Sequence, residues 1–295
     1  MTRIEMPTER IDYLQLALPT AGPALVARWG TQWDPFTVAA WDGLETPPGW
    51  MLTERVLHLS PDGEWASTFD EKSGEVRVTR VGASGPASVL SRDGGAGNVW
   101  TAVAPGGVAV AWMEGAVTLV SALPGGEAVA RVKSGWAFDL QFSPGGRWLT
   151  EKGERAFRVF DRDARYKAIA RIPTPGYFLA DVADGPTAVV TGADKGSVSV
   201  WDLAARSATA TFQVEGTVSA LAISADGQRV LTGDLEGGVT LWDAAGVRLR
   251  SYEWDVPTPI AAVFSREGAR AAVGGTGGAI VVWDLDDWAA PRAAQ

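Results

Sequence analysis

The stretch Gly238-Val239-Thr240-Leu241-Trp242-Asp243 decides the fold, because similar stretches recur along the chain at an almost constant spacing. It aligns without gaps with Ser197-Val198-Ser199-Val200-Trp201-Asp202 and with Ala279-Ile280-Val281-Val282-Trp283-Asp284. The same interval, continued towards the N-terminus, gives seven equivalent positions: Trp41, Thr79, Val120, Phe160, Trp201, Trp242 and Trp283. Successive positions are 38 to 41 residues apart. Such a period indicates a chain built from seven copies of one structural unit.

A second marker recurs in step with the first. Each unit carries a short Gly-, Pro- or Asp-containing sequence typical of a tight turn, at residues 19–22, 60–63, 104–107, 143–146, 182–185, 224–227 and 265–268. Runs rich in Val, Ala and Leu, such as 218–223 and 229–232, lie between the markers and are too short for helices. Each unit is therefore predicted to be a small antiparallel sheet.

One small sheet cannot bury both of its faces, whereas seven sheets arranged radially can cover one another and leave only short edges. The chain resembles the WD-repeat β-propeller family through Trp41-Asp42, Trp201-Asp202, Trp242-Asp243 and Trp283-Asp284, with a weaker Phe160-Asp161. The resemblance covers nearly the whole chain. We therefore predict an all-β, seven-bladed propeller of four-stranded antiparallel blades, forming a single domain over residues 1–295.

The resemblance also implies how the ring closes. In the family, the N-terminal segment supplies the outer strand of the last blade, which would place residues 2–6 beside residues 279–283. The C-terminal residues 287–291 are a competing candidate for that strand, and the sequence leaves both open.

The sequence departs from the family at two polar positions that often hydrogen-bond the repeat tryptophan. The histidine position is occupied by Asp12, Thr53, Gly97, Trp136, Pro175, Thr217 and Thr258. The aspartate position, six residues before the tryptophan, is occupied by Pro35, Ser73, Glu114, Glu154, Lys195, Glu236 and Gly277. We expect packing and the sheet ladders to hold the blades, with little of that hydrogen-bond network.

Composition narrows the classes of function. The chain is 46% hydrophobic and 21% charged, and it lacks the unbroken apolar run of a membrane helix or a secretory signal, so a cytoplasmic location is expected. A formal net charge of −9, with no cluster of Lys and Arg, argues against a nucleic-acid partner. With no cysteine there is no disulfide and no thiolate metal site.

Few residues suggest catalysis. His58 is the single histidine and lies on a predicted innermost strand, where a structural role is the simplest interpretation. The glycine cluster at 274–278 is followed by a strand instead of a helix, so it is interpreted as a hairpin turn and not as a phosphate loop. We predict no catalytic residues, no metal site and no cofactor.

Two features suggest a binding face. The first unit has extra residues at 30–35, and this insertion carries Trp33 and Asp34; the aromatic ring is either a partner anchor or folded over the blade edge. By the resemblance, this loop shares the top face with loops that carry the acids Glu71, Glu114, Glu151, Glu154, Asp194, Asp234 and Glu236. These acids either attract a basic partner or bind their own turns. Trp136 and Tyr177 could add aromatic contacts there.

The leading prediction is a non-catalytic scaffold that binds a protein or peptide, basic if the acids form a ring, through the top face. A small-ligand or glycan sensor with an aromatic-lined pocket is a second hypothesis. A carboxylate- and metal-dependent hydrolase on the central channel, as in some propeller enzymes, is a third. No membrane partner is expected.

Overall fold

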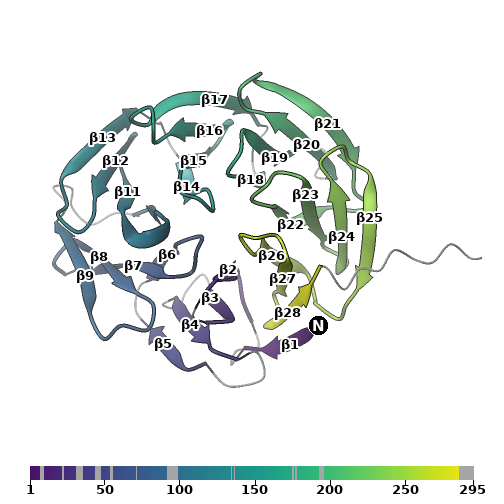
Figure 1. Ribbon diagram of the computed structural model, residues 1–295, viewed down its shortest axis with the longest axis horizontal. Helices are drawn as coiled ribbons and strands as arrows, with labels where there is room; N and C mark the ends of the chain where they lie inside the picture. Colours follow the sequence, from purple (N-terminus) through teal and green to yellow (C-terminus); the bar gives the residue numbers. More distant parts are fainter. Residues whose placement is uncertain are drawn as a thin grey trace, which may run out of the picture.

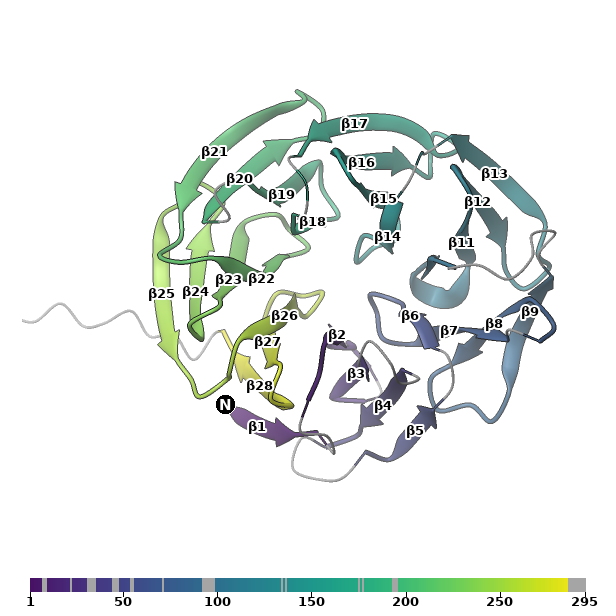
Figure 2. The same ribbon diagram turned by 180° about the vertical axis from the view of Figure 1, so that it is seen from behind.

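The structure is a computed structural model that describes residues 1–6, 10–21, 23–30, 36–43, 48–53, 56–70, 72–91, 99–133, 135, 137–174, 176, 178–192 and 196–285. The described residues form seven four-stranded antiparallel sheets, arranged as blades around a common axis (Figure 1). The view from behind shows the same closed ring (Figure 2). The predicted seven-bladed β-propeller is confirmed.

The blades are numbered by the chain order of their innermost strands, which are β2 (Tyr13–Ala17), β6 (Val56–Leu59), β10 (Thr101–Val103), β14 (Ala137–Phe142), β18 (Ala180–Val182), β22 (Val218–Ile223) and β26 (Pro259–Phe264). The second strands are β3 (Leu25–Gly30), β7 (Trp65–Asp70), β11 (Ala109–Glu114), β15 (Trp148–Gly153), β19 (Thr187–Thr191), β23 (Arg229–Asp234) and β27 (Arg270–Gly275).

The third strands are β4 (Thr37–Trp41), β8 (Glu75–Arg80), β12 (Val117–Ala122), β16 (Ala156–Asp161), β20 (Ser197–Asp202), β24 (Gly238–Asp243) and β28 (Ala279–Asp284). The outermost strands are β5 (Trp50–Thr53), β9 (Pro86–Ser91), β13 (Ala128–Lys133), β17 (Lys167–Pro173), β21 (Ser207–Gln213), β25 (Arg248–Glu253) and, in blade 7, β1 (Thr2–Glu5). A single-turn 3-10 helix, η1 (Pro105–Gly107), precedes β11. The three best repeat copies in the sequence are β20, β24 and β28.

The N-terminal strand closes the ring. β1 runs antiparallel to β28 with Ile4 opposite Ile280, and the backbone N–H of Met6 donates to the carbonyl of Gly278 at 3.0 Å. The outer edge of β28 is therefore occupied, which decides against the C-terminal alternative. Residues 287–291 lie outside the described part of the chain.

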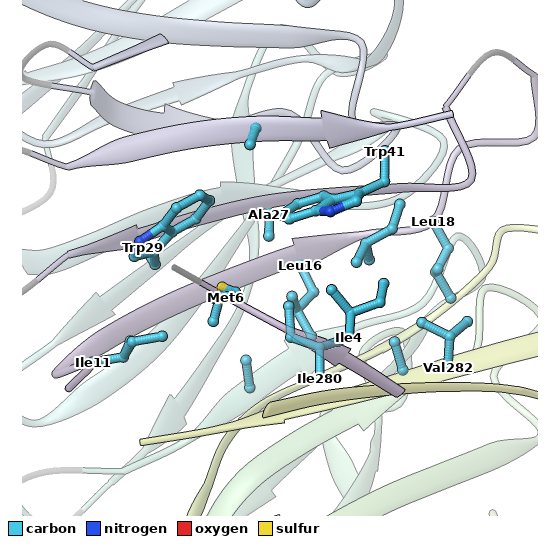
Figure 3. Packing of buried hydrophobic residues seen from close by; sticks show 14 residues of the cluster. Ile4, Met6, Ile11, Leu16, Leu18, Ala27, Trp29, Trp41, Ile280 and Val282 are labelled. Atoms are coloured by element: carbon cyan, nitrogen blue, oxygen red, sulfur yellow. The ribbon is translucent and has the colours of Figure 1, made fainter. Parts of the chain in front are cut away.

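The closure is held by apolar packing as well as by the ladder. Ile4 and Met6 pack with Ile280 of blade 7 and with Trp41 of blade 1, so the two ends of the repeat array share one core (Figure 3). These side chains are at most 6% exposed. Burial of this kind stabilises by about 25 cal/mol per Å² of apolar surface, so closure contributes several kcal/mol.

Burial explains why the inner strands are apolar on both faces of the sheet. Five of the six residues of β28 are buried, because neighbouring blades cover both faces of the sheet. The outermost β13 instead follows an alternating pattern of exposed and half-buried residues, since one of its faces meets solvent. Packing between blades, and not within one sheet, therefore forms the core.

The repeat turns use the expected backbone chemistry. Gly63, Gly146, Gly227 and Gly268 have φ between 70° and 73°, a conformation that favours glycine. Gly185 is the exception, since its φ is not positive, and its carbonyl accepts a hydrogen bond from Trp148 Nε1 of the preceding blade at 3.0 Å. Trp148 is 3% exposed, so this tryptophan outside the repeat position packs as a wedge between two blades.

Candidate functional site

The seven innermost strands run in the same direction along the channel. The loops that enter them therefore lie on one face of the ring, together with the turns between second and third strands. We call this the top face and the opposite one the bottom face. Of the residues predicted for a binding site, Trp33, Asp34, Trp136, Tyr177 and Asp194 lie outside the described residues, as does Glu71 of the acidic set.

The four described candidates, Glu114, Glu154, Asp234 and Glu236, all lie at top-face turns between second and third strands, in blades 3, 4 and 6. Asp234 Oδ1 accepts the backbone N–H of Glu236 at 3.0 Å and of Gly238 at 2.8 Å. Glu114 Oε1 accepts Trp112 Nε1 at 3.1 Å. The Asp234 carboxylate therefore binds its own turn and the Glu114 carboxylate binds a side chain of its own strand, whereas Glu154 and Glu236 are exposed.

Glu151, expected on the top rim, is instead fully buried between blades 3 and 4. Its Oε1 accepts a 2.5 Å hydrogen bond from Thr118 Oγ1 on β12, and its Oε2 lies 3.6 Å from Arg158 Nη1 on β16. The expectation fails because Glu151 belongs to β15 and points towards the neighbouring blade, so it is not part of the loop.

The central channel forms a large cavity, with a volume of about 1170 Å³ and a lining drawn from all seven innermost strands. None of the four described acids lines it. Its top end is aromatic: the exposed Tyr13 and Trp100 lie at or just before innermost strands, with Phe36, Phe138 and Phe178 close behind. Ring centroids are 5.8 Å apart for Tyr13 and Phe36, and 6.0 Å apart for Phe138 and Phe178.

Sequence reasoning missed this aromatic mouth. It singled out Trp136 and Tyr177, which neighbour Phe138 and Phe178, but not Tyr13 or Trp100. A usable signal existed, since both residues stand where the chain enters an innermost strand. The positions do not repeat from unit to unit, so a search for periodicity passes over them.

Below the mouth, charged side chains from different blades face the channel. Lys152 Nζ on β15 lies 2.8 Å from Asp139 Oδ2 on β14. Asp181 on β18 accepts the backbone N–H groups of Val182 at 2.8 Å and of Ile223, on the next blade, at 3.0 Å. Burial raises the pKa of Asp181 in spite of these hydrogen bonds and the nearby Lys152.

Arg28, on β3, lies in the channel wall. Its Nε donates to the carbonyl of Val56 on blade 2 at 3.0 Å, and its guanidinium carbon lies 4.0 Å from the centroid of the Phe36 ring. Burial lowers the pKa of Arg28 to about 10, and the more distant Asp139 opposes that shift. Arg28 is therefore still a cation at neutral pH.

His58 lines the same cavity and is 5% exposed. Burial lowers the pKa of His58 to about 4, so the ring is neutral at physiological pH. Its Nε2 lies 3.3 Å from Gln15 Nε2, whose amide also donates to the carbonyl of Leu59 at 2.7 Å. A donating amide makes Nε2 the acceptor and puts the ring proton on Nδ1. No hydroxyl nucleophile in the described chain hydrogen-bonds to this ring.

The comparison with known families adds one match. A sequence model for the "WD domain, G-beta repeat" family matches residues 207–243, which span the outermost strand of blade 5 and the three inner strands of blade 6. Six further units share its period, and together they form a closed seven-bladed ring. The chain is a WD-repeat β-propeller. No curated protein matches it at a significant level.

WD-repeat propellers typically act as platforms for protein interactions and are typically not enzymes. In this propeller, no group of three or more His, Asp or Glu side chains among the described residues is arranged to hold a metal ion. The described chain also contains no helix that is both long and apolar enough to cross a bilayer.

Proposed function

We propose that this WD-repeat propeller is a non-catalytic scaffold that binds a protein or peptide through its top face, around the channel mouth. The observation that carries the proposal is the exposure of Tyr13 and Trp100, 51% and 39%, beside a large cavity. Large aromatic side chains that fill a partner's pocket dominate the energetics of interfaces. Their exposure at a concave site is hard to explain by folding alone, because burying them would stabilise the chain.

The outer rim supports a basic contact. Glu154 and Glu236 are exposed on the top face and carry no described hydrogen bond from their carboxylates. Charges of this kind steer a partner and fix its orientation more than they add affinity. Trp33, Asp34 and Asp194 complete the proposed surface on sequence grounds.

A non-enzymatic role is supported by the state of His58, the single histidine. Its Nε2 is turned towards Gln15, and its lowered pKa of about 4 makes the ring a weak base, so it is not arranged to activate a nucleophile. We also infer a cytoplasmic location, on the composition of the chain.

The test compares matched truncations on the two faces. Tagged wild type, Tyr13→Ala, Trp100→Ala and the bottom-face control Val247→Ala are used for affinity purification with quantitative mass spectrometry. Val247 is 58% exposed, so its truncation removes a comparable exposed apolar side chain from the other face. We expect the same partner to be depleted with both top-face variants, by about tenfold or more, and to be retained with Val247→Ala.

Charge reversal at Glu154 and Glu236 then tests the rim. If the partner binds through basic residues, the reversal is expected to reduce its affinity more at low salt than at high salt. Unfolding curves establish that the variants are folded. A partner that survives both aromatic truncations but is lost with Val247→Ala would show that the scaffold uses its bottom face.

A further inference from the structure

Arg28 is the starting point, because its guanidinium is held in one orientation. Nε is tied to the carbonyl of Val56 and one face of the group lies on Phe36. Nη1 and Nη2 receive no hydrogen-bond acceptor from any described residue, and no described carboxylate lies within ion-pair distance. A fixed guanidinium with its outer edge open has the geometry for bidentate binding of a planar anion.

The other charges facing the channel already have partners. Asp139 pairs with Lys152, and Asp181 accepts two backbone N–H groups. His58 contributes no charge at neutral pH. Among the described residues, Arg28 is therefore a cation in a partly desolvated wall without a matching anion, an arrangement that costs stability. An anion bound from solution would offset that cost.

The surface above Arg28 is apolar and continuous. The Phe36 ring lies against the guanidinium, and Tyr13 lies against Phe36 with centroids 5.8 Å apart and the rings tilted by 57°, so the three groups form a continuous series of contacts that reaches the exposed rim. Leu57 also lines the channel. A flat apolar body can pack against this aromatic surface while an attached charge reaches the guanidinium.

We propose that the mouth of the channel binds a small organic anion in which a carboxylate is attached to a planar apolar group. The carboxylate takes the open edge of Arg28, and the planar group packs on Phe36 and Tyr13. The channel is larger than the 300–1,000 Å³ typical of small-molecule sites, so such a ligand fits without movement of the blades. The carboxylate can come from a free acid or from the C-terminus of a peptide that ends in an aromatic residue.

The test uses pairs of probes that differ only in charge. Indole-3-propionate and its amide represent the free acid, and N-acetyltryptophan and its amide represent a peptide end. Binding to the whole protein is measured by calorimetry and by protein NMR. Both acids, or one of them, are expected to bind at least about tenfold more tightly than the matched amide, because the amide lacks the charge-assisted pair. The acid that binds more tightly identifies whether the carboxylate comes from a free acid or from the C-terminus of a peptide.

Arg28→Gln is expected to reduce the affinity of the acid to that of the amide, and Arg28→Lys to give an intermediate affinity because it keeps the charge without the planar fork. Arg250→Gln is the matched control, since Arg250 also lies over an aromatic ring, at 5.0 Å from the Tyr252 centroid, but on the outermost strand of blade 6. Its substitution is expected to leave binding unchanged.

Equal binding of acid and amide to the unaltered protein would overturn the proposal, and this comparison needs no variant to fold. Undiminished binding of the acid to a folded Arg28→Gln protein would also overturn it. So would preferential binding of inorganic phosphate, which has no planar body. These outcomes are independent of the purification experiment, because that experiment truncates the rim and does not depend on a carboxylate.

Discussion

Blade 6 and blade 1 share one architecture but place their polar side chains differently. In blade 6, Trp242 Nε1 donates to Thr232 Oγ1 at 2.9 Å, and Ser224 Oγ, in the turn before β23, accepts the N–H of Arg229 at 2.9 Å. Both contacts stay within the blade. In blade 1, the side chains of Gln15 and Arg28 instead hydrogen-bond the backbone of blade 2, at Leu59 and Val56.

The difference teaches where to look for function in a repeat protein. In blade 6, polar residues at repeat positions satisfy the turns and strands of their own unit, so their loss is expected to reduce stability. In blade 1, Gln15 and Arg28 do not have that task, and they line the channel. The three predictions below test this contrast, from the largest expected effect on stability to the smallest.

Truncation of Trp242 should give the largest loss. The side chain is 8% exposed, stacks on Phe212 with centroids 4.6 Å apart, and makes the hydrogen bond to Thr232. Removing a buried aromatic ring leaves a cavity, so Trp242→Ala is expected to cost about 3–5 kcal/mol of unfolding free energy. Urea unfolding followed by circular dichroism measures it.

The contrasting change in blade 1 is Arg28→Gln. It removes a partly desolvated cation that has no paired anion among the described residues. The free energy of unfolding is therefore expected to change by little, in either direction. A cost for Arg28→Gln equal to that of Trp242→Ala would contradict the assignment of Arg28 to the channel and make it a structural residue.

The second prediction concerns pH at the contact between blades 1 and 2. His58 has a folded-state pKa of about 4, below its ordinary value of 6.5, so the unfolded chain takes up the proton more readily. Its contribution to stability is complete above pH 6.5 and declines as the pH falls towards 4. The linkage relation gives a loss of about 2 kcal/mol between pH 7 and pH 5.

His58→Gln removes the titrating ring. The variant is expected to lose stability less steeply over this interval, by about the same 2 kcal/mol, in urea unfolding at the two pH values. Other groups titrate in both proteins, so the difference in slope isolates His58. Parallel pH profiles for wild type and variant would show that the pKa of His58 is the same in the folded and the unfolded chain.

Much of the fold was predictable because a repeat is a strong signal. The spacing of Trp201, Trp242 and Trp283 predicts the blade number, and the turn sequences predict where each sheet reverses. The closing strand was predictable only as one of two alternatives, since the N-terminal residues 2–6 and the C-terminal residues 287–291 were both candidates for the same sheet edge. The pairing of Ile4 with Ile280 decides between them, and that pairing depends on the three-dimensional position of the last blade.

The site was predicted less well for a physical reason. Tyr13, Phe36 and Arg28 belong to one blade, and they meet because the antiparallel register of β2, β3 and β4 brings them to the same end of that sheet, which the repeat spacing does not give. Glu151 was misplaced because its burial depends on Thr118, which belongs to a different blade. Contacts between blades are not reflected in the residue spacing within a single unit, so composition and period cannot predict them.

The smallest predicted effect concerns the aspartate that follows the repeat tryptophan, compared between the same two blades. Asp243 Oδ1 accepts the N–H of Ala245 at 3.0 Å and of Val247 at 2.8 Å, and so it holds the turn between β24 and β25. Asp42, at the equivalent position of blade 1, is exposed and receives no hydrogen bond from the described residues around it.

Asp243→Ala is therefore expected to cost about 1 kcal/mol, the value of a turn hydrogen bond, and Asp42→Ala to stay within about 0.5 kcal/mol of wild type. Urea midpoints measured side by side resolve this difference. Because the two residues occupy the same place in the repeat, the comparison separates the geometry of the turn from the identity of the side chain. Equal costs would mean that the aspartate stabilises every unit alike, and the contrast between blade 6 and blade 1 would then be confined to the channel.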